Sequence, residues 1–185
     1  MSFYVFACVV CLGSWAVWAY IPAFRAPHGQ KRSSITAKGP TLVGVLLEIA
    51  AYSVAGIFHT NYAPSWPRLV AVVIAGPLGV ILMWKAVSHL GRQFRINAGL
   101  YEDHELVRTG PYVIVRHPIY ASMLLMLVAT AMLVTRPPWM AVAFGLFLIG
   151  TEIRVRTEDG LLKSRFGGQF DEYRHRVSAY IPFVR

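Results

Sequence analysis

The sequence predicts an all-α integral membrane protein with five transmembrane helices, of which the last two form a helical hairpin. The chain has 185 residues, of which 56% are hydrophobic and only 15% are charged. Soluble domains are about one-quarter charged, so this chain has too little polar surface for a water-soluble globule. The apolar residues gather in long runs, and the formal net charge of +9 lies mostly in the connections between those runs.

Each apolar run is interpreted as one span of a single membrane domain that covers residues 1–185. No positive n-region, as in a cleaved signal peptide, precedes the first run, so we expect that run to be retained. A helix needs roughly 20 apolar residues to cross a hydrocarbon core of about 30 Å, and the runs are close to that length. The expected spans are residues 3–24, 41–59, 69–90, 119–135 and 138–157.

The connections between the spans differ in length and in composition. Residues 25–40 are basic, contain Gly, Pro and Ser, and have no apolar period, so we expect a loop there. Arg136-Pro137-Pro138 joins the last two spans and is too short for anything except a tight helical hairpin. This hairpin returns the chain to the side of the membrane that it left, so the polar segments 91–118 and 158–185 share one face.

The basic residues predict which face this is. Fifteen of the 18 Lys and Arg residues lie in residues 25–40, in 91–118 or from residue 154 onward, and only Arg68 and Arg136 lie on the other side. The positive-inside rule then places the N-terminus outside and the C-terminus in the cytoplasm. Such short basic loops favour membrane lipids as partners and argue against nucleic-acid binding.

The first stretch that could carry chemistry is HELVRTGPYVIVRHPIY, residues 104–120. Pro118 suits the first turn of a helix, so we expect the fourth span to begin there with His117 as its cap. Arg116, His117 and Tyr120 would then surround a helix N-terminus, which favours a carboxylate or another anion. The alternative is that Arg116 reaches lipid phosphates and the tyrosines form an interfacial belt.

The second stretch, residues 154–174, lies beyond the hairpin on the same face. Arg154 and Glu158 are four residues apart and share one face of a helix, so a simple ion pair between them is one interpretation. An arginine just inside an apolar run can also bind an anionic ligand or extend to the headgroups. Glu158 and Asp159 near a helix C-terminus oppose the helix dipole and call for a compensating cation from the protein or from a ligand.

The remaining candidate groups favour structural roles. Glu48 and Lys85 lie at similar depths in neighbouring spans, so we expect them to pair. Cys8 and Cys11 form a CxxC in an apolar run, which is typical of two small packed residues rather than of a redox or zinc site. We expect no metal, because no ligand pattern connects the four candidate side chains, which are His104, His117, Glu158 and Asp159.

Together, the two stretches resemble the isoprenylcysteine carboxyl methyltransferase family and its relatives among the phospholipid N-methyltransferases. The resemblance covers roughly residues 92–182 and depends on the order and spacing of short motifs. These motifs are His104-Glu105-Leu106-Val107, Gly110-Pro111-Tyr112, Arg116-His117-Pro118-Ile119-Tyr120, Arg154, Glu158-Asp159, Leu161-Leu162, Phe166-Gly167, Tyr173 and Ile181-Pro182.

The resemblance implies a methyltransferase that binds S-adenosylmethionine on the cytoplasmic side of the membrane without a Rossmann domain. It implies that Arg154 and Glu158 are the catalytic residues, with Arg154 on the substrate side. The implied cofactor contacts are His104, Glu105, Leu106, Val107, Tyr112, His117, Pro118, Ile119, Tyr120 and Glu158, and Asn97 corresponds loosely to a further polar contact. The chain departs from the family pattern at Asp159, where Glu is usual, and at Ser122, where Gly is frequent.

The acceptor implied by the resemblance is a lipophilic small molecule or lipidated substrate that arrives laterally from the bilayer, most simply a carboxylate of the isoprenylcysteine kind. A carboxylate is already nucleophilic, whereas an amine, a thiol or a phospholipid amine would need a base that the sequence does not reveal. Two further alternatives are an NADPH-dependent enzyme of the sterol-reductase type and a non-enzymatic membrane scaffold. The sequence predicts no oligomeric state.

Overall fold

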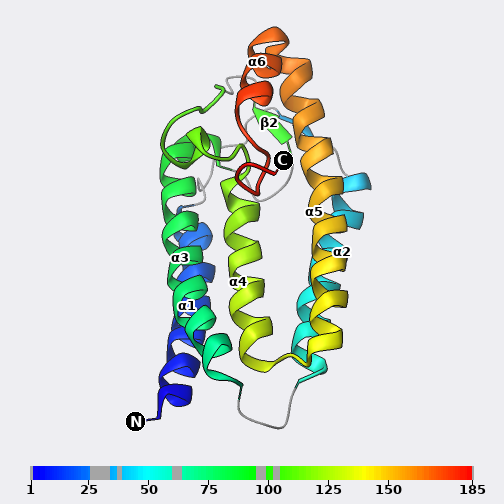
Figure 1. Ribbon diagram of the computed structural model, residues 1–185. Helices are drawn as coiled ribbons and strands as arrows, with labels where there is room; N and C mark the ends of the chain where they lie inside the picture. Colours follow the sequence, from blue (N-terminus) through cyan, green and yellow to red (C-terminus); the bar gives the residue numbers. More distant parts are fainter. Residues whose placement is uncertain are drawn as a thin grey trace.

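The computed structural model describes residues 2–25, 34–36, 39–59, 64–94, 99–101 and 105–184 of the chain. Five long helices account for most of it, and Figure 1 shows them side by side in one bundle. Their bounds are α1 (Phe3–Arg25), α2 (Gly39–Ile57), α3 (Trp66–Leu90), α4 (Pro118–Val134) and α5 (Pro137–Phe166). The shorter elements are η1 (Gly91–Gln93), η2 (Gly110–Val113), α6 (Gly168–Arg176), β1 (Ser34–Thr36) and β2 (Gly99–Tyr101).

The helices agree with the expectation of a helical membrane protein. In the described part of the chain, α1, α2, α3 and α5 are long and apolar enough to cross a membrane, and α4 is a shorter apolar helix. Their outer faces expose large apolar side chains, among them Leu12, Leu42 and Ile74. Exposed apolar surface of this extent is unusual for a soluble monomer and suits contact with lipid.

The expected hairpin keeps its short connection, but its two legs do not pack as a pair. Only Thr135 and Arg136 separate α4 from α5. However, α4 packs mainly against α3, and α5 packs mainly against α2, so the two legs diverge away from the connection (Figure 1). In addition, α5 continues to Phe166 rather than ending near residue 157, because helix-forming residues follow the apolar part.

A pair of short strands, which the all-helical prediction did not include, joins two connections at one end of the bundle. Strands β1 and β2 pair antiparallel, with Ile35 opposite Leu100. The pairing satisfies backbone groups of two segments that are far apart in the sequence. The segment 25–40, which we expected to be a loop, therefore contains a strand.

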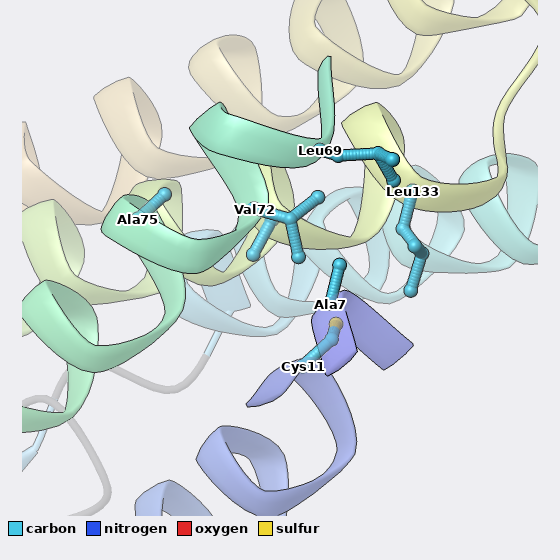
Figure 2. Packing of buried hydrophobic residues seen from close by; sticks show 7 residues of the cluster. Ala7, Cys11, Leu69, Val72, Ala75 and Leu133 are labelled. Atoms are coloured by element: carbon cyan, nitrogen blue, oxygen red, sulfur yellow. The ribbon is translucent and has the colours of Figure 1, made fainter. Parts of the chain in front are cut away.

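Small residues allow the helices to approach closely. One cluster joins α1, α3 and α4, and Figure 2 shows Cys11 and Ala7 facing the side chains of Val72 and Leu133. Small side chains at such contacts are typical of helices in membranes. Cys11 is buried and both cysteines are free, which agrees with a packing role for this CxxC.

Figure 1 shows the N-terminus at one end of the bundle and the C-terminus near the other. At the end near the N-terminus, Arg68 donates hydrogen bonds from Nη2 to the carbonyls of Ala131 and Thr135, at 2.8 and 2.6 Å. Arg136 donates from Nε to the carbonyl of His59, at 3.0 Å. The two arginines that the charge count places on this side therefore bind carbonyls at helix ends, which need donors.

Candidate active site

A cavity of about 610 Å³ lies at the end of the bundle that carries α6 and the C-terminal segment. Residues from α1, α2, α3, α4 and α5 line it, together with the segment before α4. One part of the lining is polar and includes Arg154 and Glu158, and another part is aromatic and includes Trp15, Trp18 and Tyr52. Ligand sites in proteins have volumes of this order, with a few polar groups in a mainly apolar wall.

The cavity brings together the cofactor contacts and catalytic residues that the family resemblance implied. His104 and Asn97 lie outside the described residues. All the others line the cavity, although their positions in the sequence span more than 50 residues. They are Glu105, Leu106, Val107, Tyr112, His117, Pro118, Ile119, Tyr120, Arg154 and Glu158.

The N-terminus of α4 is fixed as the motif predicts. Pro118 occupies the first helical turn, and His117 is the N-cap residue, without a hydrogen bond from its side chain to the helix. The backbone N–H groups of Arg116 and His117 donate to the carbonyls of Ser178 and Ala179, both at 2.8 Å. The C-terminal segment therefore holds the beginning of α4 in place, which is a contact that helical periodicity does not predict.

His117 is buried between two carboxylates. Its Nε2 lies 2.9 Å from Asp159 Oδ1, and its Nδ1 lies 3.3 Å from Glu158 Oε2. Burial alone would lower the pKa of His117, but the hydrogen bonds to Asp159 and Glu158 raise it above its ordinary value. A ring that donates from both nitrogens is the imidazolium, so His117 is the compensating cation that the acidic pair requires.

Glu158 and Asp159 have different environments despite being adjacent. Asp159 is buried and also accepts a hydrogen bond from Arg116 Nη2, at 2.9 Å. Glu158 lines the cavity and accepts a hydrogen bond from the hydroxyl of Tyr120. Asp159 therefore belongs to the framework that holds His117 and Arg116, whereas Glu158 is the carboxylate that a ligand in the cavity can reach.

Arg154 pairs with Glu48, which corrects one expectation and replaces one of the interpretations left open for Arg154. Its Nη1 lies 2.6 Å from Glu48 Oε2, whereas we expected Glu48 to pair with Lys85 and considered Glu158 as the partner of Arg154. Thr151 donates to Glu48 Oε1 at 3.0 Å. The reason is that α2 packs on α5 rather than on α3, which leaves Lys85 exposed on the surface.

The contact between α2 and α5 is unusually close at this point. A Cβ atom on Gly44 would overlap the Cγ atom of Arg154 and lie 2.7 Å from the carbonyl oxygen of Gly150. Glycine at both positions is therefore required for the two backbones to approach. This approach places Glu48 beside Arg154, whose guanidinium carbon lies 4.7 Å from the centre of the Tyr120 ring.

The aromatic part of the cavity is held by hydrogen bonds that sequence reasoning missed. Trp15 donates from Nε1 to Thr130 Oγ1 at 2.9 Å, and Trp18 donates to Ser122 Oγ at 3.2 Å. The Tyr52 hydroxyl donates to the carbonyl of Met123 at 2.7 Å. Ser122, a departure from the family pattern, thus has a specific partner on α1, which a pattern of apolar residues could not reveal.

Comparison with known proteins agrees with the family resemblance of the residues that line the cavity. The model of the isoprenylcysteine carboxyl methyltransferase family matches residues 69–164, which is more than half of the chain. The chain belongs to the isoprenylcysteine carboxyl methyltransferase family. The expected methyltransferase is thereby confirmed, and the methyl donor of this family is S-adenosylmethionine.

Individual relatives of the family extend over most of the chain. Protein-S-isoprenylcysteine O-methyltransferase B of Arabidopsis thaliana is 31% identical over 166 residues, which cover 86% of this chain and 83% of the relative. A probable protein-S-isoprenylcysteine O-methyltransferase of Oryza sativa subsp. indica is 34% identical, with 90% of this chain and 96% of the relative covered. The nickel-cobalt-cadmium resistance protein NccN of Alcaligenes xylosoxydans xylosoxydans is 30% identical over 67% of this chain and 55% of its own length.

Proposed function

We propose that this chain transfers a methyl group from S-adenosylmethionine to the carboxylate of a lipophilic acceptor of the isoprenylcysteine kind. The observation that carries the proposal is the position of Arg154 in the cavity wall, against the ring of Tyr120, in a cavity that aromatic side chains such as Tyr52 also line. A site for this reaction needs one region for a charged donor, one for an apolar chain and a cation that orients the acceptor's carboxylate. The lining supplies all three.

The polar part of the cavity suits the donor. S-adenosylmethionine supplies an electrophilic methyl group on a cationic sulfonium, and it also carries an amine, a carboxylate and an adenine. Glu158 and the faces of Tyr112 and Tyr120 would hold the cationic groups. The free N–H groups at the beginning of α4 would hold the carboxylate, and apolar side chains such as Leu106 and Leu162 would contact the adenine.

The acceptor region requires no base. A carboxylate oxygen is nucleophilic without losing a proton, so the protein needs only to align the acceptor with the methyl group and to exclude water. Nε of Arg154 is buried and has no hydrogen-bond partner among the described residues, so it can donate to an acceptor carboxylate. Trp15, Trp18 and Tyr52 would contact the apolar chain of the acceptor.

The membrane arrangement in this proposal has five spans, with the fifth formed by α4. Helix α4 has 17 residues, at the lower limit for crossing a bilayer. It lies between longer apolar helices. With α4 the number of spans is odd, and an odd number is needed for the two termini to lie toward opposite ends of the bundle, as in Figure 1. The excess of basic residues on the side of the cavity supports a cytoplasmic active site with the N-terminus outside.

Calorimetric binding of S-adenosylhomocysteine to the protein in detergent tests the donor part of the proposal, with NADPH measured in parallel. We expect micromolar binding of S-adenosylhomocysteine and none of NADPH. Binding of NADPH alone would favour a reductase. Binding of neither compound to a folded sample would favour a non-enzymatic scaffold, and it would contradict the proposal.

A panel of acceptors then tests the second part. Methylation of a prenylcysteine carboxylate supports the proposal. Methylation of only a phospholipid amine, a small amine or a thiol would contradict it and would identify that compound class as the acceptor. The same panel, measured in vesicles and in detergent, shows whether the acceptor must enter from the bilayer.

A further inference from the structure

We infer that Glu48 is a positioning residue of the active site, which holds Arg154 so that one edge of its guanidinium faces the acceptor. The inference rests on the proposed function, since it concerns how the acceptor's carboxylate is bound. Glu48 lies on α2, outside residues 69–164 that match the family model. It therefore adds to the site a residue that the family motifs do not include.

The contacts of Glu48 hold its carboxylate firmly. The residue is only 3% exposed, although it lies in a membrane-spanning helix, where an ionisable group is costly unless it is paired. One carboxylate oxygen accepts a hydrogen bond from Thr151, and the other accepts one from Arg154. Thr151 and Arg154 are three residues apart on α5, so Glu48 bridges two positions on the same face of that helix.

The geometry at Arg154 separates the two edges of the guanidinium. Glu48 accepts from Nη1, whereas Nε and Nη2 form another edge with two parallel N–H donors. Nε on that edge is buried without a hydrogen-bond partner among the described residues, and the residue lines the cavity. An edge with two such donors matches the two oxygens of a carboxylate. Glu48 thus binds one side of Arg154 and leaves the other for the acceptor.

Two further contacts prevent the guanidinium from turning. The ring of Tyr120 lies against it, with 4.7 Å between the guanidinium carbon and the ring centre. The side-chain stem of Arg154 packs at Gly44, where any larger residue would overlap it. Arg154 is consequently fixed by an ion pair, an aromatic face and a close helix contact. Among these three contacts, only the ion pair with Glu48 offsets the positive charge of the guanidinium.

This arrangement predicts a specific effect of Glu48 on the acceptor. If Glu48 positions Arg154, removing its charge loosens the guanidinium and weakens binding of an acceptor carboxylate. If Glu48 instead competes with the acceptor for Arg154, removing its charge strengthens that binding. The two roles therefore predict opposite changes in the KM of the acceptor.

The test compares the steady-state kinetics of the wild-type protein and Glu48→Gln in vesicles, with an S-prenylcysteine acceptor. We expect the KM of the acceptor to rise at least about ten-fold, the ratio that corresponds to loss of one charge-assisted hydrogen bond. Affinity for S-adenosylhomocysteine should stay within about two-fold, which shows that the donor region is intact. A lower or unchanged KM would overturn the inference.

Two control variants separate positioning from a general loss of structure. Glu152→Gln removes a carboxylate of the same helix α5 that pairs with Arg156 at the surface, and it should leave both constants unchanged. Thr151→Val removes one hydrogen bond to Glu48 without altering the ion pair, and we expect a smaller rise in the same KM. This variant also tests the inference if Glu48→Gln does not fold, because an unchanged KM in Thr151→Val would then count against it.

A binding measurement adds a readout that a merely structural role would not change. A prenylcysteine amide lacks the carboxylate, so its inhibition constant should be the same for wild type and Glu48→Gln, whereas the KM of the acid should rise. Equal losses for both compounds would make Glu48 structural. If the wild-type protein methylates no prenylcysteine carboxylate, the proposed function fails and the inference fails with it; if the wild-type protein is active and only the Glu48 results disagree, the inference fails alone.

Discussion

The two ends of the bundle use arginines in different ways. At the end near the N-terminus, Arg68 donates to backbone carbonyls of α4 and of the residue that follows it. At the other end, Arg116 and Arg154 bind the carboxylates of Asp159 and Glu48. Arg68 also has a buried Nε without a hydrogen-bond partner among the described residues, so an unpaired donor alone does not indicate a site.

The difference is the cavity. Arg116 and Arg154 line it, whereas Arg68 does not, and aromatic and acidic side chains lie beside them. An arginine that binds only carbonyls satisfies a helix end. An arginine that is neutralised by a carboxylate and lies beside a cavity can bind a ligand without leaving an uncompensated charge. The comparison predicts that variants at one end change ligand binding and that variants at the other change stability.

The largest effect is expected at Glu158. Glu158→Gln should lower the affinity for S-adenosylhomocysteine at least about 100-fold, because the cationic groups of the ligand lose their carboxylate. Calorimetry checks the affinity, and the thermal unfolding temperature should stay close to that of the wild type. Unchanged affinity would contradict the assignment of Glu158 to the donor.

The next largest effect is expected at Arg154. Arg154→Lys keeps the charge but loses the edge with two N–H donors, so turnover should fall about 100-fold. The affinity for S-adenosylhomocysteine should remain within about two-fold of the wild-type value. Loss of both activity and donor binding would indicate that Arg154 supports the structure of the whole cavity.

A smaller and different effect is expected at the opposite end. Arg68→Met removes the two hydrogen bonds to carbonyls of α4 and Thr135, which should lower the free energy of unfolding by about 1–3 kcal/mol. Thermal unfolding in detergent measures this loss, and activity per folded molecule at low temperature should be unchanged. A change in donor or acceptor binding would show that the two ends are not independent.

The smallest effect concerns pH. The pKa of His117 is raised in the folded protein, so the stability from its protonation is fully present below its unfolded pKa of about 6.5. This contribution is lost as the pH rises through the higher folded value. The thermal unfolding temperature of the wild type should therefore fall more steeply above neutral pH than that of His117→Asn. Parallel pH curves for the two proteins would contradict a protonated His117.

Much of the fold and part of the candidate site could be predicted from the sequence. The apolar runs fixed four long helices and the shorter α4 to within a few residues, except at the end of α5. The motifs also indicated the polar residues of the cavity around α4 and α5, because Pro118 sets where α4 begins and a spacing of four residues sets which side chains of α5 share a face.

Partners from distant helices could not be predicted. The similar depths of Glu48 and Lys85 in neighbouring spans suggested that they pair. Depth within a span contains no information on which helix packs beside α2. The small residues Gly44 and Gly150, which allow α2 to approach α5, are the signal that could have indicated the correct pair. The bonds between the C-terminal segment and the beginning of α4 likewise depend on backbone groups, which carry no sequence pattern.

The most direct test of the account is the transfer of a labelled methyl group from S-adenosylmethionine to an N-acetylated S-farnesylcysteine in vesicles, followed by treatment with mild base. The account predicts a labelled product that releases its label as methanol, since a methyl ester is cleaved by base. A base-stable product would show methylation of nitrogen or sulfur, and absence of transfer by a protein that binds S-adenosylhomocysteine would exclude this acceptor. Either result would contradict the proposed carboxylate acceptor beside Arg154.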